Sequence, residues 1–177
     1  EDIYKSCTHY QVDDEVHLMI DLIKNDLLEE YEDLSTDGYR VLGIAYREFP
    51  QTKTTFSVAD ESDLILLGYI AFLDPPKGSA ASAIALLKEV GVSTKILTGD
   101  NALVTRKICK DVDIDAGEIV TGDRLIGLDE SALGELAEKT NVFARLSPSQ
   151  KEAIIIALQK RNHVVGYMGD GINDAPS

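Results

Sequence analysis

The second half of the sequence alternates between helical and β patterns, and this alternation constrains the fold more than any other feature. The expected helices are 80–90, 102–110, 131–139 and 148–161, and the expected strands are 93–97, 141–144 and 163–168. Strands that alternate with helices in this way predict parallel βαβ units, and hence an α/β fold. In such sheets ligands bind beyond the carboxyl ends of the strands. The residues that follow the strands are therefore the first candidates for a site.

The first half has a different pattern. The expected elements are an amphipathic acidic helix over 13–37 and two strands over 40–46 and 64–72. Pro75 and Pro76 then stop the second strand, because proline cannot donate a hydrogen bond to a β ladder. We therefore place a domain boundary there and predict two domains, 1–74 and 75–177.

Composition excludes several classes of function. The net charge of −14 argues against a nucleic-acid partner, because phosphate backbones require clustered Lys and Arg. Cys7 and Cys109 lie far apart and form no metal-binding spacing, so we expect two buried thiols in a reducing, intracellular setting. The longest apolar run, 64–73, is well short of the roughly 20 residues that span a bilayer.

A glycine-bracketed turn at 169–176 carries the most chemistry in the sequence. Asp170 and Asp174 offer the hard oxygen ligands that Mg2+ prefers, and Asn173 can donate a hydrogen bond to a phosphate oxygen. Gly169 and Gly171 let the backbone approach a ligand closely. This turn predicts a magnesium-phosphate site. Its position at the last residues predicts that the chain is a piece of a longer protein, cut within a catalytic domain.

Two further segments follow predicted strands. Thr98 and the Gly99 amide can hold phosphate oxygens at the start of a helix, and Lys151, just inside the helix opened by Ser147-Pro148, can neutralise phosphoryl charge. Taken singly, each has a plainer interpretation: Asp100 or Asn101 as a helix cap, and Lys151 as a solvated surface lysine. Together with the glycine-bracketed turn, the segments favour one shared phosphate site.

Two other patterns resemble sites and are rejected. The alternating aspartates of 111–115 lack the glycine and glutamate that an EF-hand loop requires, and they follow a helix and not a strand, so we expect a surface loop. The three histidines, His9, His17 and His163, are scattered and predict no metal cluster.

Four motifs occur in the order and approximate spacing of one known family. They are Leu73-Asp74-Pro75-Pro76-Lys77, Thr98-Gly99-Asp100-Asn101, Val142-Phe143-Ala144-Arg145 with Lys151, and Gly169 to Pro176. With them, essentially the whole chain resembles P-type cation-transporting ATPases. The amino-acid sequences of 71–77, 98–101 and 105–109 look most like those of the bacterial magnesium-transporting branch. Calcium pumps are the next most similar branch. The double proline counts against the heavy-metal pumps.

The resemblance implies a fold and a setting. Residues 1–74 would be the C-terminal part of an α+β nucleotide-binding domain. Residues 75–177 would be an incomplete phosphorylation domain with a haloacid-dehalogenase-like Rossmannoid sheet. The chain would be the cytoplasmic portion of a bacterial inner-membrane pump that uses ATP and Mg2+ to move a divalent cation through an aspartyl-phosphate intermediate. The branch it resembles implies that this cation is Mg2+.

The resemblance also implies roles for single residues. Thr98, Gly99 and Asp100 would surround the phosphoryl group, and Lys151 would stabilise the aspartyl phosphate. Asp170 would hold Mg2+, with Asn173 and Asp174 ordering the site. Arg40, in Gly-Tyr-Arg-Val-Leu, would contact ATP phosphates, Arg145 would lie near the nucleotide, and Asp74 would be a hinge acid. Arg40 could instead be a simple strand-edge charge.

One departure from the family pattern is decisive for activity. The Asp-Lys-Thr-Gly-Thr segment that carries the phosphorylated aspartate is absent, so the chain alone is expected to be inactive. Without that strand, we expect the later half to be partly disordered, rearranged or paired with another chain, and not a full five-stranded sheet. A soluble phosphatase of the haloacid-dehalogenase class is the alternative function, and a nucleotide-sensing module without catalysis is a weaker third.

Overall fold

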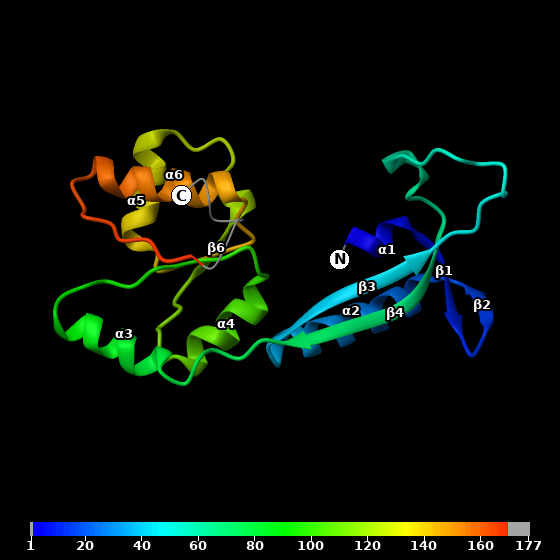
Figure 1. Cartoon of the computed structure of the whole chain (residues 1–177), viewed down its shortest axis with the longest axis horizontal. Coiled ribbons are helices and arrows are strands. Elements are labelled where there is room, and N and C mark those ends of the chain that lie inside the picture. Colours follow the sequence, from blue (N-terminus) through cyan, green and yellow to red (C-terminus); the bar gives the residue numbers. More distant parts are fainter. Residues whose placement is uncertain (1, 170–177) are drawn as a thin grey trace. The chain divides into compact units, whose positions relative to one another are not determined.

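The computed structural model describes residues 2–169, which fall into two compact units with the boundary between Asp74 and Pro75. The chain is a mixture of α and β structure (Figure 1). Among residues 2–169 we find no helix with the length and apolar character needed to cross a membrane.

The first unit is built on a mixed four-stranded sheet in the order β2-β1-β4-β3. Its elements are α1 (Asp2–Ser6), β1 (Cys7–Val12), β2 (Glu15–Leu18), α2 (Asp21–Thr36), β3 (Tyr39–Tyr46), the 3-10 turn η1 (Val58–Asp60) and β4 (Leu64–Leu73). The β1–β2 and β3–β4 pairs are antiparallel, and β1–β4 is parallel. Helix α2 packs along β3, so one face of the β3–β4 ribbon is covered.

A small apolar core joins α1, α2 and the sheet. Tyr4, Cys7, Met19 and Leu66 are buried in it. The hydroxyl of Tyr69 on β4 donates to the Leu27 carbonyl of α2 at 3.1 Å and lies in hydrogen-bond contact with the Tyr4 hydroxyl. Burial raises the pKa of Tyr69, because its charged form would be desolvated. These contacts hold α2 against the ribbon.

The prediction of one helix over 13–37 was wrong in its first third. Asp13 and Asp14 have positive φ values of 48° and 66° and form a two-residue turn between β1 and β2, with Val12 paired to Glu15. A turn with both central residues at positive φ matches the twist of a hairpin, and aspartate tolerates this conformation. The helix begins at Asp21, and Gly38, at φ 95°, follows its C-cap Asp37 as expected.

The second unit has a three-stranded parallel sheet in the order β5-β7-β6 within the described residues. Its elements are α3 (Ala80–Glu89), β5 (Ile96–Leu97), α4 (Ala102–Asp111), β6 (Ile119–Thr121), the 3-10 turn η2 (Gly122–Leu125), α5 (Glu130–Lys139), β7 (Val142–Ala144) and α6 (Pro148–Lys160). Strands and helices alternate as the sequence predicts.

The central strand β7 is buried on both faces. Phe143 packs with Val120, Ala137 and Ile154 in one cluster, which places α5 and α6 on one face of the sheet. Val142 and Ala144, which alternate with Phe143, are also fully buried, and α4 contacts β6 and β7. Figure 1 shows the α5–α6 pair and α4 on either side of the strands.

One expectation in this unit was wrong, and one strand was missed. Residues 163–169 form no strand, and Val164 and Met168 are fully exposed, because no neighbouring strand within 75–169 offers them a ladder. The three-residue strand β6 was missed, since so short a segment carries no measurable alternation. Cys7 and Cys109 are both buried and unpaired, which confirms the expectation of two buried thiols.

Candidate phosphate site at the carboxyl edge of the parallel sheet

The segments that follow β5 and β7 are tied together at the carboxyl edge of the sheet. The Thr98 amide donates to the Phe143 carbonyl at 3.0 Å, and the Leu146 amide donates back to the Thr98 carbonyl at 3.0 Å. A third hydrogen bond between the same two segments runs from the Arg145 amide to the Asp100 carbonyl at 2.8 Å. Four of the residues proposed from the sequence, Thr98 with Gly99 and Asp100, and Arg145, are therefore neighbours in the structure.

The Thr98 side chain organises the turn after β5. Its hydroxyl donates to an Asp100 carboxylate oxygen at 3.0 Å and accepts from the Asp100 amide at 3.1 Å. Gly99 is exposed, and a side chain there would meet the Leu146 carbonyl at an ordinary 3.5 Å. The turn thus presents a hydroxyl, a carboxylate and a glycine backbone at the strand end.

The next residue confirms the plainer interpretation for part of this motif. The Asn101 side chain accepts from the Val104 amide at 2.9 Å and is the N-cap of α4. Of the two candidates for the cap, Asn101 fills the role. Asp100 is left to interact with Thr98 and with the segment after β7.

Helix α6 begins at the same edge, as the Ser-Pro start predicts. Ser147 is the N-cap, Pro148 occupies the first turn, and Ser147 and Gln150 form a capping box. The Lys151 amide donates to the Ser147 carbonyl at 3.1 Å, so Lys151 lies in the first turn of the helix. The positive end of the helix macrodipole is therefore directed to this edge, where it favours an anion.

A second Thr-Gly-Asp tripeptide, at 121–123, lies at the end of β6 and was missed in the sequence. A hydrogen bond from the Thr121 side chain lowers the pKa of Asp123, and Arg145 and Arg124 act in the same direction. Gly122 is buried against the segment that follows β7: a side-chain β carbon there would lie 2.4 Å from the Arg145 carbonyl oxygen. The repetition of the tripeptide after two strands was the signal that could have identified it.

Arg145 stands between the two Thr-Gly-Asp turns in an unusual conformation. Its φ of 51° is rare for a residue with a side chain and costs of order 1–3 kcal/mol, so the surroundings must hold it. Its amide is bonded to Asp100, and its carbonyl packs against Gly122. The Arg145 side chain is exposed, while its backbone is fixed by the turn after β5 on one side and by the turn after β6 on the other.

The metal-ligand residues proposed from the sequence, Asp170 and Asp174, lie outside the described residues, as does Asn173. Within residues 2–169, no cluster of three or more His, Cys, Asp or Glu side chains could hold a metal ion. Two of the aspartates of 111–115 bind groups of the protein: Asp111 pairs with Lys107 at 2.6 Å, and Asp115 accepts a hydrogen bond from the Gly117 amide.

In the first unit, Arg40 lies on the exposed face of the β3–β4 ribbon. Its guanidinium is 3.7 Å from the Asp74 carboxylate, and both side chains are largely exposed. The residues that share this face are apolar and exposed, and the register pairs Leu42 with Ile70 and Arg40 with Phe72. The guanidinium therefore lies beside an apolar surface.

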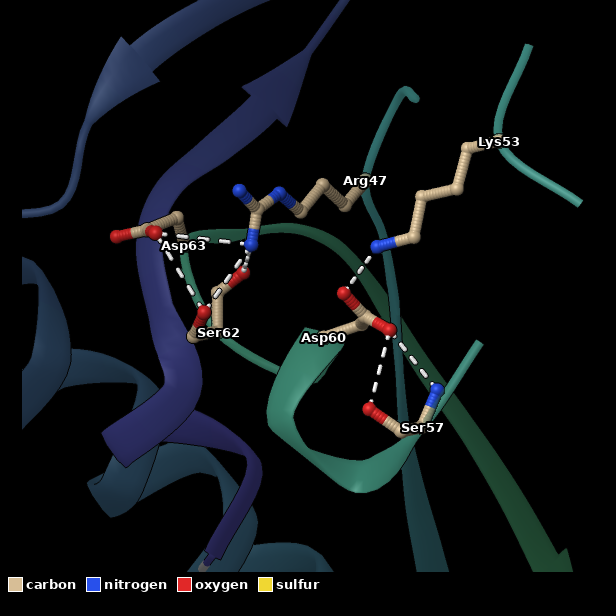
Figure 2. A network of polar contacts seen from close by, with 6 residues as sticks. All are labelled: Arg47, Lys53, Ser57, Asp60, Ser62 and Asp63. Carbon is tan, nitrogen blue, oxygen red and sulfur yellow. Dashed lines mark hydrogen bonds and ion pairs between the residues drawn. The ribbon is translucent and has the colours of Figure 1, made fainter. Parts of the chain in front are cut away.

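A loop of the first unit, 47–63, holds a separate polar network (Figure 2). Arg47 donates to the Ser62 carbonyl at 2.8 Å and pairs with Asp63, while Lys53 bonds to Asp60 and lowers the pKa of that carboxyl. The loop borders a pocket of about 580 Å³ lined by Phe49, Phe56, Ile3 and Leu64, among others. Because both cations are held by carboxylates of the loop itself, we do not assign phosphate binding to this pocket.

Comparison with known proteins identifies the class. A family model described as "P-type ATPase, cytoplasmic domain N" matches residues 1–79, and curated P-type ATPases match the whole chain. The chain belongs to the P-type cation-transporting ATPases, as the sequence motifs indicated.

The individual relatives are bacterial pumps. The chain is 44% identical over 177 residues to the magnesium-transporting ATPase, P-type 1, of Escherichia coli (strain K12). The aligned region covers 100% of the chain and 20% of that protein. A calcium-transporting ATPase 1 of Lactococcus lactis subsp. lactis (strain IL1403) is 35% identical over 99% of the chain and 20% of its own length. The chain thus spans about a fifth of the length of the curated relatives it matches.

Proposed function

We propose that the chain is the cytoplasmic part of an ATP-driven cation pump that works through an aspartyl-phosphate intermediate. Residues 1–74 would be the C-terminal part of its nucleotide-binding domain, and residues 75–177 part of a haloacid-dehalogenase-like phosphorylation domain. The observation that carries the proposal is the junction of Thr98–Asp100 with Arg145–Leu146 at the carboxyl edge of a parallel sheet. Ligands of α/β sheets bind at this edge.

In this proposal the edge binds the phosphoryl group. The Gly99 amide would donate a hydrogen bond to a phosphate oxygen. The Thr98 hydroxyl, which donates to the Asp100 carboxylate at 3.0 Å, would turn its single hydrogen to a second phosphate oxygen when phosphate binds. The Lys151 ammonium would neutralise the charge of the aspartyl phosphate at the positive end of α6. Asn173 would donate to a further phosphate oxygen.

Two carboxylates that follow the described residues in the sequence suit a Mg2+ ion. Carboxylate oxygens are the ligands that Mg2+ prefers, and Asp170 and Asp174 would supply them. The ion would reduce the negative charge on the phosphate oxygens. Replacing Asp170 with Asn removes one ligand charge, so phosphorylation at limiting Mg2+ should fall.

In the first unit, Arg40 is the candidate for ATP binding. Arg40 offers a guanidinium beside an exposed apolar surface that includes Leu42 and Phe72, which suits a ligand with a planar ring and an anionic tail. The surface ion pair with Asp74 contributes at most about 1 kcal/mol, so an ATP phosphate could compete for Arg40. In the second unit, considered by itself, Arg145 is the candidate for a nucleotide contact.

The experiment that tests the proposal is phosphorylation of the full-length protein by ATP labelled on its γ-phosphate. We expect an acid-stable, hydroxylamine-labile phosphoenzyme, which is the signature of an acyl phosphate, and no label on the 177-residue chain alone. A phosphatase that turns over without any hydroxylamine-labile intermediate, or label on the isolated chain, would contradict the proposal.

The transported ion follows the similarity to magnesium-transporting relatives, so we propose a divalent cation, with Mg2+ first. Transport into vesicles that contain the full-length protein, measured in parallel with Mg2+, Ca2+ and Ni2+, tests this part separately. Uptake of Ca2+ in preference to Mg2+ would place the chain with the calcium pumps.

A further inference from the structure

One glutamine side chain joins the segments that follow two strands of the second unit, β6 and β7. Gln150, in the first turn of α6, donates through Nε2 to the Gly122 carbonyl at 2.7 Å, and its Oε1 accepts from the Ser147 amide at 2.9 Å. Its own amide donates to the Ser147 hydroxyl at 3.3 Å. The side chain therefore connects the start of α6 to the turn after β6.

The contact requires a carboxamide and a glycine. A carboxamide has a donating NH2 group and an accepting oxygen in fixed geometry, whereas an ionised glutamate in the same capping box could accept from Ser147 but not donate to a carbonyl. Gly122 leaves the space for it, because a β carbon there would lie 2.6 Å from Oε1 of Gln150 and 2.4 Å from the Arg145 carbonyl oxygen. Both groups are at least half-buried.

The other side of the same segment is fixed by the turn after β5. Arg145 and Leu146 donate their amides to the Asp100 and Thr98 carbonyls. The stretch 145–150 is thus bonded to the β5 turn through its backbone and to the β6 turn through Gln150. Lys151 follows directly on that stretch, so the place of its backbone depends on both connections.

We propose that Gln150, seated on Gly122, is a positioning residue that fixes the first turn of α6 and hence the Lys151 ammonium for phosphoryl transfer. This inference rests on the proposed function, since it assigns Lys151 to the phosphate. A misplacement of about 1 Å can cost up to about 100-fold in rate. Because only the helix start would shift, we expect a loss of about 10-fold.

The test separates rate from binding in the full-length protein. Gln150→Leu should lower the rate of phosphorylation per active site about 10-fold and leave the KM for ATP within about 2-fold, because the backbone of Arg145, the proposed nucleotide contact in this stretch, keeps its own hydrogen bond to Asp100. Gln150→Glu, which keeps the acceptor but loses the donor, should lower the rate similarly and serves if the leucine variant fails to fold. Gln159→Leu, at the exposed far end of the same helix, is the matched control and should change neither quantity.

A second measurement needs no catalysis. Gln150→Leu should raise the hydrogen-exchange rate of the Ser147 amide in the 177-residue chain about 10-fold, and Gln159→Leu should not. Unchanged rate per active site in both Gln150 variants of an active pump, or a changed KM with unchanged rate, would overturn the inference. If the wild-type protein forms no phosphoenzyme, the proposed function fails, and exchange at Ser147 still decides whether Gln150 holds the helix start.

Discussion

Replacing Gly122 with alanine should destabilise the second unit through one steric contact. Gly122 is not at positive φ, so the cost is spatial and not conformational. The added carbon would lie 2.4 Å from the Arg145 carbonyl oxygen, about 0.6 Å inside the 3.0 Å below which real β carbons are essentially never found. The peptide group that carries this carbonyl cannot retreat freely, because its N–H, that of Leu146, donates to the Thr98 carbonyl at 3.0 Å.

The magnitude follows from two terms. Overpacking of a close contact costs about 1–3 kcal/mol. Displacing Gln150, whose Oε1 would be 2.6 Å from the new carbon, weakens its two side-chain hydrogen bonds at about 0.5–1.5 kcal/mol each. We expect a loss of about 3 kcal/mol in the free energy of unfolding, which at a urea m-value of about 2 kcal/mol/M lowers the midpoint by about 1.5 M.

The assay is urea unfolding of the 177-residue chain followed by far-UV circular dichroism. Gly78→Ala is the matched control, because a β carbon at Gly78 meets nothing within 4 Å and its φ is not positive. That variant should be neutral or slightly stabilising, since it reduces the entropy of the unfolded chain. If Gly122→Ala falls within about 0.5 kcal/mol of Gly78→Ala, the close packing of Gly122 on Arg145 is refuted.

Three further predictions concern single contacts. Arg161 holds the pKa of Glu138 at about 2, well below its ordinary 4.5, so this ion pair stabilises the fold above pH 5, and the stabilisation is lost as the pH falls towards 2. In thermal melts, the difference in stability between wild type and Glu138→Gln should therefore shrink from pH 5 to pH 2. A difference that stays constant would contradict this role of the pair. Asn101→Ala should cost about 1 kcal/mol in urea unfolding through loss of the α4 cap, and no loss would reject that cap. Burial raises the pKa of Cys7 and Cys109, so both thiols should react with an aromatic disulfide reagent only after unfolding; rapid reaction of the native chain would contradict their burial.

The strand and helix alternation of the second unit could be predicted because each element carries its own local signal. Ser147-Pro148 marks the start of α6, and the prediction of its first residue was right. The strand expected over 163–168 shows the limit of such signals: its residues favour a strand, but a strand also needs a neighbour to pair with. Pairing is a property of the tertiary structure and cannot be inferred from the segment alone.

The first unit shows the opposite case, in which a short turn overrides a long pattern. Apolar spacing over 13–37 suggests one helix, yet Asp13 and Asp14 at positive φ reverse the chain and make a hairpin. The aspartate pair was the relevant signal, and it was outweighed by the periodicity.

The candidate site was predictable where a motif follows a strand, and not where two segments touch. Thr98–Asp100 and Arg145 were identified from the sequence, and the structure brings them together. The contact of Gly122 with Arg145 and Gln150 could not be predicted, because it depends on which strand lies beside which. Only the repeated Thr-Gly-Asp tripeptide pointed to that strand end.

The central claim is that the carboxyl edge of the parallel sheet is a phosphate site, and one measurement tests it most directly. The initial rate of phosphoenzyme formation from ATP would be compared in the full-length protein for wild type, Thr98→Ala, Lys151→Ala and the control Lys160→Ala, which removes an ammonium at the other end of α6. We predict a loss of at least about 100-fold for Thr98→Ala and Lys151→Ala, in the range seen when a stabilising donor is removed, and wild-type rates for Lys160→Ala. Wild-type rates for Thr98→Ala and Lys151→Ala would contradict the account.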